Sequence, residues 1–367
     1  MSVVDAHFHI FATDDVPGCR LSTRARYRPS GIVAGCMLRI LDDGLHDDLG
    51  ALFRPHRAPA RHQALTSALI RDRLLEEIRG CGHLDGVVLL ALDAVYDSET
   101  GKQQPSDVVV TNDWVQHIIT AHHGEADGKR LYLGASVNPH RADWRQELDR
   151  IQGWGAKLIK WIPSSQRIDP ADWRLGEFYR ELALREIPLL CHAGPEDAVP
   201  DEPRRWWPPW KRNAWELFNH PRRLVPALEA GVTVIVAHCA SPYLPWYALD
   251  SSQKNYVPTL ADMFDEADRR GWKLYADISA LLLTPWRAGK VRRLFAPPYV
   301  KRLIYGSDFP IPTSDFSCGR LRLDANSELA DQASSTDNLL DRDVLAKRSV
   351  GVPEEVMERT AHVLRIA

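Results

Sequence analysis

The sequence has no apolar stretch long enough to span a bilayer, and its second residue leads directly into a short apolar run without a signal-peptide pattern. Its six cysteines form no CxxC pair or dense cluster, which excludes a disulfide framework and a zinc ribbon. The net charge is −3 with both signs interspersed, so no basic surface for nucleic acid is expected. We therefore expect a soluble, cytoplasmic protein with a small-molecule substrate and no nucleic-acid or membrane partner.

Neither a GxGxxG motif nor a P-loop follows the first apolar run, which argues against an open nucleotide-binding sheet. The sequence does contain eight short apolar runs rich in β-branched residues, and most of them are separated by segments with helical periodicity. They cover residues 3–9, 87–93, 131–138, 156–162, 188–193, 233–239, 273–279 and 302–308. Several are almost continuously hydrophobic, as parallel strands covered on both faces are. The pattern predicts an α/β fold, a single (β/α)8 TIM barrel over residues 1–367 with long loops at its C-terminal face.

The first run ends on a pair of histidines, His7 and His9. Residues two apart on a strand project to the same face, so both imidazoles can bind one ion, whereas Phe8 points the other way. Taken alone, such a pair is more often explained by chance or by histidines that hydrogen-bond within the core. A metal site at this pair therefore requires further candidate ligands nearby.

Three later runs end on an imidazole or a carboxylate: His192, His238 and Asp308. In a barrel the carboxyl ends of all strands meet at one rim, where the catalytic residues of this fold lie. Imidazoles with a carboxylate suit zinc or a similar divalent ion, and a catalytic site leaves one coordination position open for water. A water activated in this way attacks the substrate, and Asp308 can act as the general base.

Lys160 lies in the run "AKLIKWI" on the same face as two apolar residues. One interpretation is that its ammonium extends to the rim or pairs with a carboxylate. The other is that the lysine is carboxylated and bridges two metal ions. The sequence leaves both open, and with them the number of ions.

The segments "DAHFH", "CHAG", "AHCASP" and "YGSDFP" together resemble the amidohydrolase superfamily, and most closely its amidohydrolase-2-type barrels, over nearly the whole chain. The resemblance implies that His7, His9, His192 and Asp308 bind a divalent metal, most often zinc. It implies that His238 binds a second ion in two-metal members and contacts water or substrate in one-metal members. A homodimer is a further expectation from the family.

The loops between the runs supply the remaining expectations. The long segment from about 194 to 222 is predicted to be a lid over the site. Arg20, Arg24 and Tyr243 are candidates to hold a carboxylate or carbonyl of the substrate, and Trp161 is a further candidate contact. The predicted function is metal-dependent hydrolysis of an amide, ester or lactone in a small polar organic molecule. The alternatives are a metal-dependent nonoxidative decarboxylase and a catalytically inert binding barrel.

Overall fold

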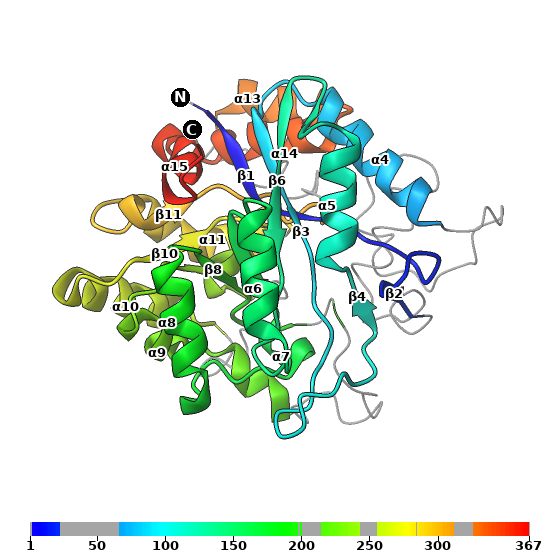
Figure 1. Ribbon diagram of the computed structural model, residues 1–367. Coiled ribbons are helices and arrows are strands. Elements are labelled where there is room, and N and C mark those ends of the chain that lie inside the picture. The colour runs from blue at the N-terminus through cyan, green and yellow to red at the C-terminus, as the bar shows by residue number, and fades with distance from the viewer. Residues whose placement is uncertain are drawn as a thin grey trace, which may run out of the picture.

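The computed structural model describes residues 2–22, 66–196, 199, 214–242, 255–283, 285–311 and 326–366. Within these residues, eight parallel strands form one sheet whose spatial order follows the chain (Figure 1). They are β1 (Val4–His9), β3 (Gly86–Leu90), β6 (Lys129–Ala135), β7 (Leu158–Trp161), β8 (Leu189–Cys191), β9 (Val234–Val236), β10 (Leu274–Asp277) and β11 (Leu303–Ile304). Six of them lie inside a predicted run, and β3 and β6 overlap theirs but begin one and two residues earlier, so the eight predicted strands are confirmed with small differences in their bounds.

The sheet closes on itself between its first strand and the segment that follows its last. Ala6 N–H donates to the Tyr305 carbonyl at 3.3 Å, Asp308 N–H to the His7 carbonyl at 2.8 Å, and His9 N–H to the Phe309 carbonyl at 2.9 Å. This parallel pairing joins the two edges of the sheet, as the closed sheet of a TIM barrel requires.

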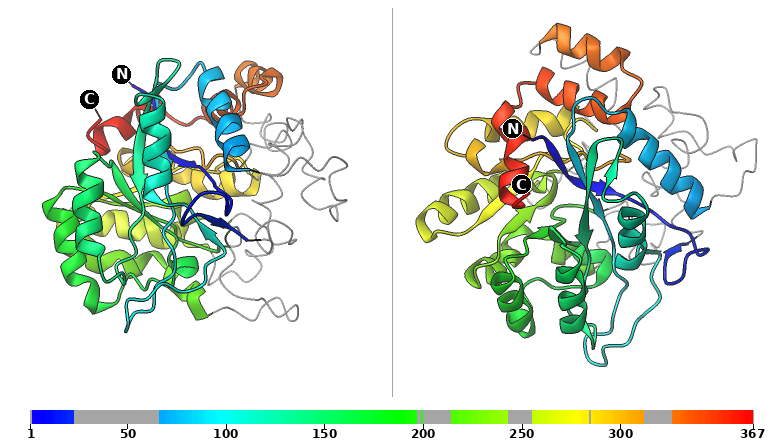
Figure 2. Two further views of the ribbon diagram at one scale, coloured as in Figure 1. Left: turned by 45° about the vertical axis from the view of Figure 1, so that its right-hand side comes forward. Right: turned by 45° about the horizontal axis from the view of Figure 1, so that its top comes forward.

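Helices surround the sheet, as the views in Figures 1 and 2 show, and the helix over residues 327–335 packs mainly against the helix that follows it. They are α4 (Ser67–Gly80), α5 (Asn112–Ala121), α6 (Trp144–Gly153), α7 (Pro163–Gln166), α8 (Gly176–Leu184), α9 (Val225–Glu229), α10 (Val257–Arg270), α11 (Pro285–Val291), α13 (Ser327–Ser335), α14 (Leu339–Ser349) and α15 (Glu354–Val363). Short strands supplement the barrel: β5 (Glu125–Ala126) pairs with β6, and β2 (Arg20–Leu21) pairs with β4 (Val108–Val109). Short 3-10 turns connect several of these elements: η1 (Trp173–Leu175), η2 (Ala214–Asn219), η3 (Pro221–Leu224), η4 (Ala237–Ala240), η6 (Arg292–Phe295) and η7 (Val300–Arg302).

Alternate residues of the strands belong to two different cores. Leu158 and Leu190 face the barrel interior, in a small cluster that the end of α15 closes with Val363 and Leu364. Their neighbours, such as Ile159, face outward into the larger core beneath the helices. Side chains alternate along a strand, so every second residue faces the barrel interior. Beyond the small cluster, the inward-facing residues at the carboxyl ends of the strands are polar and point into the mouth of the barrel.

The described residues contain no helix that is both long and apolar enough to cross a membrane. Of the predicted lid at 194–222, the structure describes residues 194–196, 199 and 214–222. The prediction that this segment covers the site therefore lies largely outside the described residues.

Candidate metal centre

His7 and His9 enter the mouth of the barrel from the end of β1. A register shift between Asp5 and Phe8 marks an irregularity in the pairing of β1 with β3. Phe8 points outward, as predicted, and stacks on Phe309 with ring centroids 4.9 Å apart. The strand thus anchors the two histidines through the buried phenylalanine between them.

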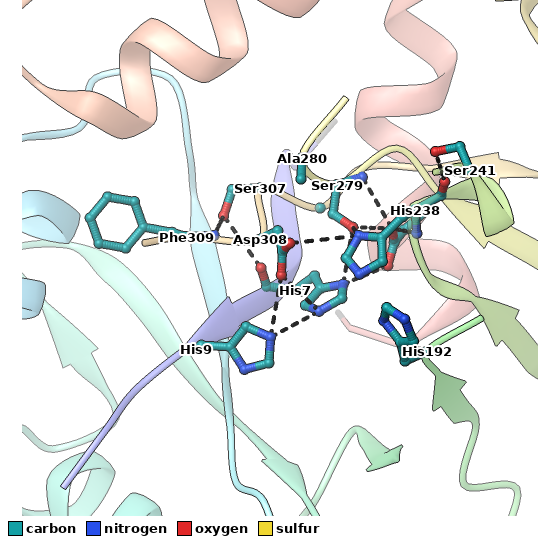
Figure 3. Close-up of polar contacts among 12 residues, drawn as sticks. His7, His9, His192, His238, Ser241, Ser279, Ala280, Ser307, Asp308 and Phe309 are labelled. Carbon is teal, nitrogen blue, oxygen red and sulfur yellow. Dashed lines mark hydrogen bonds and ion pairs between the residues drawn. The ribbon is translucent and has the colours of Figure 1, made fainter. Parts of the chain in front are cut away.

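Asp308 completes a group of three potential ligands (Figure 3). Its Oδ1 lies 3.3 Å from Nε2 of both His7 and His9, and the two Nε2 atoms lie 3.1 Å apart. Ligands about 2.1 Å from a tetrahedral ion are themselves separated by about 3.4 Å. The three atoms are therefore spaced as one face of the coordination shell of a single divalent ion.

Asp308 reaches this position through an uncommon backbone conformation. Its φ of 67° lies in the left-handed region, which costs an L-residue strain and is found most often at functional sites. Hydrogen bonds to buried Asp5 support the segment: Ser307 donates its backbone N–H at 2.9 Å and also its hydroxyl, and His7 donates its N–H at 2.9 Å. Asp5 thus ties the β1 ligands to the segment that carries Asp308.

The ring of His7 is oriented by Asp277, at the end of β10. His7 Nδ1 lies 2.8 Å from Asp277 Oδ2, and both side chains are fully buried. Metal-binding histidines usually donate the second ring N–H to such a carboxylate, which directs the lone pair of the first nitrogen toward the ion. Asp277 lies within the predicted run at 273–279, but no role was predicted for it. The need of a ligand histidine for a carboxylate partner is the signal that would have singled it out.

His192 shows a similar arrangement with Glu196. Its Nδ1 lies 3.3 Å from Glu196 Oε2, and its Nε2 is buried with no hydrogen-bond partner among the residues that the structure describes. Leaving a buried polar atom without a hydrogen-bond partner costs free energy. We therefore expect this nitrogen to bind a ligand in the pocket. Among the described residues His192 lies outside the close group of His7, His9 and Asp308, although it lines the same pocket. Its predicted role as a ligand stays a prediction.

Lys160 is buried beside His7. It is 1% exposed, and its Nζ lies 2.8 Å from His7 Nε2. The structure thus brings Lys160 next to the candidate ligands. The two interpretations of this side chain, a free amine and a carboxylated lysine, both stay predictions.

His238 lies beside this group on the short turn η4, where its own φ is 56°. Its ring centroid is 5.0 Å from that of His7 and 5.1 Å from that of His192, and its Nδ1 lies 3.7 Å from Asp308 Oδ2. The structure thus brings His238 next to the candidate ligands, at the wall of the pocket.

Burial dominates the electrostatics of these groups. It lowers the pKa of His9 to about 4 and that of His192 to about 3, and it lowers the pKa of His238 well below its usual value. Burial alone raises the pKa of Asp308, but the neighbouring histidines outweigh it and hold this pKa well below its usual range. At neutral pH the imidazoles of His9, His192 and His238 are therefore neutral and Asp308 is a carboxylate, the forms that bind a metal.

These shifts predict that the metal-free protein loses stability below about pH 6. The unfolded chain binds protons at His9, His192 and His238 as the pH falls through 6.5, whereas the folded chain does not. Asp5 offsets one of these three protons. Burial raises its pKa to about 6, so below this pH the folded chain binds a proton at Asp5 that the unfolded chain does not yet bind. For these three histidines and Asp5 together, the net difference of about two protons contributes roughly 3 kcal/mol of unfolding free energy per pH unit.

Urea denaturation in the presence of a chelator, repeated between about pH 6 and pH 5, measures this slope. His192→Gln should reduce the slope by about 1.4 kcal/mol per pH unit, because one of the three histidines is lost. His362→Gln, on the exposed face of α15, is the control and should leave it unchanged. An unchanged slope in the His192 variant would contradict the prediction.

The pocket above the three ligands has a volume of about 850 Å³, including the space open to solvent at its mouth. Its walls are mostly apolar, and Lys160, His192, His238 and Asp308 lie among the polar groups that line it. Two further polar residues, Glu196 and Arg287, were not predicted. Arg287 is 4% exposed and donates to the Ser241 hydroxyl at 2.8 Å. No sequence motif marks either residue, because both lie on connections beyond the strand ends.

The structure corrects the prediction that Trp161 contacts the substrate. Its side chain is fully buried in the outer core, where it stacks on Phe178 and its indole N–H donates to the Val137 carbonyl at 2.8 Å. Trp161 follows Lys160 directly, so the alternation of side chains that turns the lysine inward turns the tryptophan outward.

The other three predicted substrate contacts have different outcomes. Arg20 is exposed on β2 and does not line the pocket, so the structure does not bring it to the site. Arg24 and Tyr243 lie outside the described residues.

The polar residues Asp93 and Asn138, which end two predicted runs, also do not line the pocket. Asp93 accepts the backbone N–H of Asn138 at 2.8 Å and pairs with Arg141 at 3.2 Å. These strand ends serve to fix the neighbouring loops.

Comparisons with known proteins bear on the fold. No family model and no curated protein matches the sequence. Among solved structures, an uncharacterised TIM-barrel protein from Bordetella bronchiseptica is similar with a TM-score of 0.52 and 15% identity, over 95% of this chain and 100% of that chain. The 5-carboxyvanillate decarboxylase of Sphingomonas paucimobilis has a TM-score of 0.51 and 12% identity, over 100% of this chain and 99% of that chain.

A Pseudomonas putida protein assigned as a 2-pyrone-4,6-dicarboxylic acid hydrolase also has a TM-score of 0.51 and 12% identity, over 99% of this chain and 97% of that chain. These likenesses confirm the TIM-barrel fold over essentially the whole chain. It is the fold that the sequence resemblance implies.

Proposed function

We propose that the chain is a metal-dependent hydrolase of the amidohydrolase superfamily that cleaves an amide, ester or lactone bond. The observation that carries this proposal is the close group of His7, His9 and Asp308 at the base of the pocket. A divalent ion held there would lower the pKa of a water molecule from about 16 toward about 7 and polarise the bond to be broken. Two imidazoles and one carboxylate favour zinc, with His192 as a fourth candidate ligand.

Asp308 has one oxygen for each of two tasks. Its Oδ1 is the atom close to the two histidine Nε2 atoms, whereas its Oδ2 is directed toward His238, 3.7 Å from that ring's Nδ1. A carboxylate oxygen outside the ligand group can accept a proton from the attacking water. We therefore assign Asp308 as both ligand and general base.

The pocket favours a substrate with an apolar body. Ile10, Phe11, Leu92, Val110 and Ile162 are among the side chains that form its walls, and the polar groups that line it include the candidate ligands. Binding sites of this kind hold the body of a ligand by apolar contact and orient it through a few polar groups. We infer a small organic molecule whose reacting bond is polar and whose remainder is apolar.

We propose that the site holds a single ion, because the ligand atoms of His7, His9 and Asp308 form one close group. Lys160 Nζ lies 2.8 Å from His7 Nε2, and we propose that it is an unmodified amine. Burial lowers the pKa of Lys160, which favours the neutral amine. A neutral amine is not repelled by a neighbouring cation.

Metal analysis tests the proposal directly. Protein purified without chelator is expected to contain about one divalent ion per chain, and the intact mass should show no added carbon dioxide on Lys160. Two ions and a carboxylated lysine would contradict the single-ion assignment. No stoichiometric ion at neutral pH would contradict the enzyme itself and favour an inert binding barrel.

Arg287 favours a second candidate, a metal-dependent nonoxidative decarboxylase. Its buried guanidinium lines the pocket and is close enough to lower the pKa of His238 and His192, although burial is the larger cause. Such a cation can orient a substrate carboxylate. The fold neighbours comprise both a decarboxylase and a protein assigned as a hydrolase.

A screen of esters, lactones, amides and aromatic carboxylic acids in water enriched in the heavy oxygen isotope separates the two reactions. A hydrolase incorporates solvent oxygen into its product, whereas a decarboxylase releases carbon dioxide and does not.

A further inference from the structure

His238 is held in place from three directions. Its backbone N–H donates to Asp277 Oδ1 at 2.8 Å. Its carbonyl accepts the Ser241 N–H at 3.0 Å and the Ser241 hydroxyl at 2.6 Å. These bonds support a turn in which His238, Cys239 and Ala240 all have positive φ. Such a conformation persists only where the surroundings enforce it, so the position of the ring is well defined.

The third contact is a hydrogen bond to the ring from the neighbouring strand end. Ser279 Oγ lies 2.7 Å from His238 Nδ1 and 3.1 Å from His7 Nδ1, and it also contacts Asp277 Oδ1 (Figure 3). All of these residues are buried. A serine hydroxyl has one proton to donate and two lone pairs that accept, so the destination of that proton decides the state of the ring.

Asp277 is the acceptor in this group. Its Oδ1 already accepts the N–H groups of His238 and Ser279 at 2.8 Å and 3.0 Å, and its Oδ2 lies 2.8 Å from His7 Nδ1. A carboxyl surrounded by donors is favoured in its ionised form, which can only accept. The Ser279 proton is therefore directed to Asp277, and the Ser279 oxygen presents a lone pair to His238 Nδ1.

We propose that Ser279 is a positioning residue that keeps the proton of His238 on Nδ1, so that Nε2 has the lone pair in the substrate pocket. His238 then accepts a hydrogen bond or a proton there, from water or from a hydroxyl of the substrate. The opposite tautomer would make His238 a donor to a substrate carbonyl. The catalytic consequence rests on the proposed function, whereas the tautomer itself does not.

Nitrogen-15 NMR of histidine-labelled, metal-free protein above neutral pH tests the tautomer without any substrate. The chemical shifts of the two ring nitrogens separate a protonated nitrogen from a bare one, and His238→Gln identifies the signals of this ring. We expect Nδ1 to be protonated and Nε2 to be bare. A protonated Nε2, or an average of the two tautomers, would overturn the proposal.

Ser279→Ala tests the cause. The Nδ1–H preference should be lost, and kcat should fall by about 100-fold while KM changes little, because the ring stays but its proton is misplaced. Ser279→Thr retains the hydroxyl and should restore the wild-type tautomer. Ser349→Ala is the matched control, because this buried hydroxyl donates to the Ala346 carbonyl and contacts no histidine.

An alanine variant that keeps a fully protonated Nδ1 would show that Ser279 does not set the tautomer. If Ser279→Ala does not fold, the wild-type spectrum and the threonine variant still decide the question. Failure to find any substrate would count against the proposed function and would leave the NMR result unaffected.

Discussion

Replacing Asp308 by asparagine is expected to remove the divalent ion and nearly all activity. Asparagine has the same shape, but its amide is neutral and cannot accept the proton from water. The site would lose its only carboxylate within the group of three close ligands. We expect the metal content after dialysis to fall from about one ion per chain to near zero, and turnover to fall by about 1000-fold or more.

Metal analysis and steady-state kinetics measure both effects. Asp169→Asn is the control, because this carboxylate pairs with Arg223 and does not line the pocket. The metal-free forms of the two variants should have similar circular dichroism spectra. An Asp308 variant that retains the ion and its turnover would show that the metal centre lies elsewhere.

Gly306→Ala is expected to displace His7 and thereby disrupt the site without replacing a ligand. A methyl group at Gly306 would lie 2.8 Å from His7 Cβ, 3.4 Å from Ser279 Cβ and 3.5 Å from Asp277 Cβ. The His7 Cβ atom at 2.8 Å must move, whereas the two longer distances are ordinary van der Waals contacts. Overpacking of this kind costs about 1–3 kcal/mol of unfolding free energy. The shift of the His7 ring should weaken metal binding by about 10- to 100-fold.

Chemical denaturation of the metal-free protein and competition with a chromophoric chelator measure the two effects. The matched control is Gly153→Ala at the end of α6, where an added methyl group meets no atom within 4 Å. The steric explanation predicts a loss in the Gly306 variant alone. Equal losses in both variants would refute it.

The barrel could be predicted because its signal is local. Each strand is a short apolar run, and the polar residue at the end of each run marks the rim at which parallel strands meet. His7, His9 and Asp308 were found in this way, although about 300 residues separate the first two from the third. The same alternation explains the error at Trp161, whose neighbour Lys160 already occupied the inward position.

Asp277, Glu196 and Arg287 were not predicted as part of the site because their importance depends on distances between elements. Asp277 matters because its two oxygens reach the ring of His7 on β1 and the backbone of His238 on the turn η4. The register and closure of the barrel set these distances, and no sequence spacing encodes them.

The sequence by itself determined the fold and the identity of the candidate ligands, because hydrophobic periodicity places strands and strand ends place polar side chains at one rim. Only the tertiary structure decided which nitrogen of each ring faces the pocket. The choice depends on the group that contacts Nδ1 of each ring. This group is Asp277 for His7, Glu196 for His192 and Ser279 for His238. The tautomer of a histidine is set by the hydrogen bond that one ring nitrogen makes with a neighbouring group. Most of these neighbours are distant in the sequence, so only folding brings them into contact with the ring.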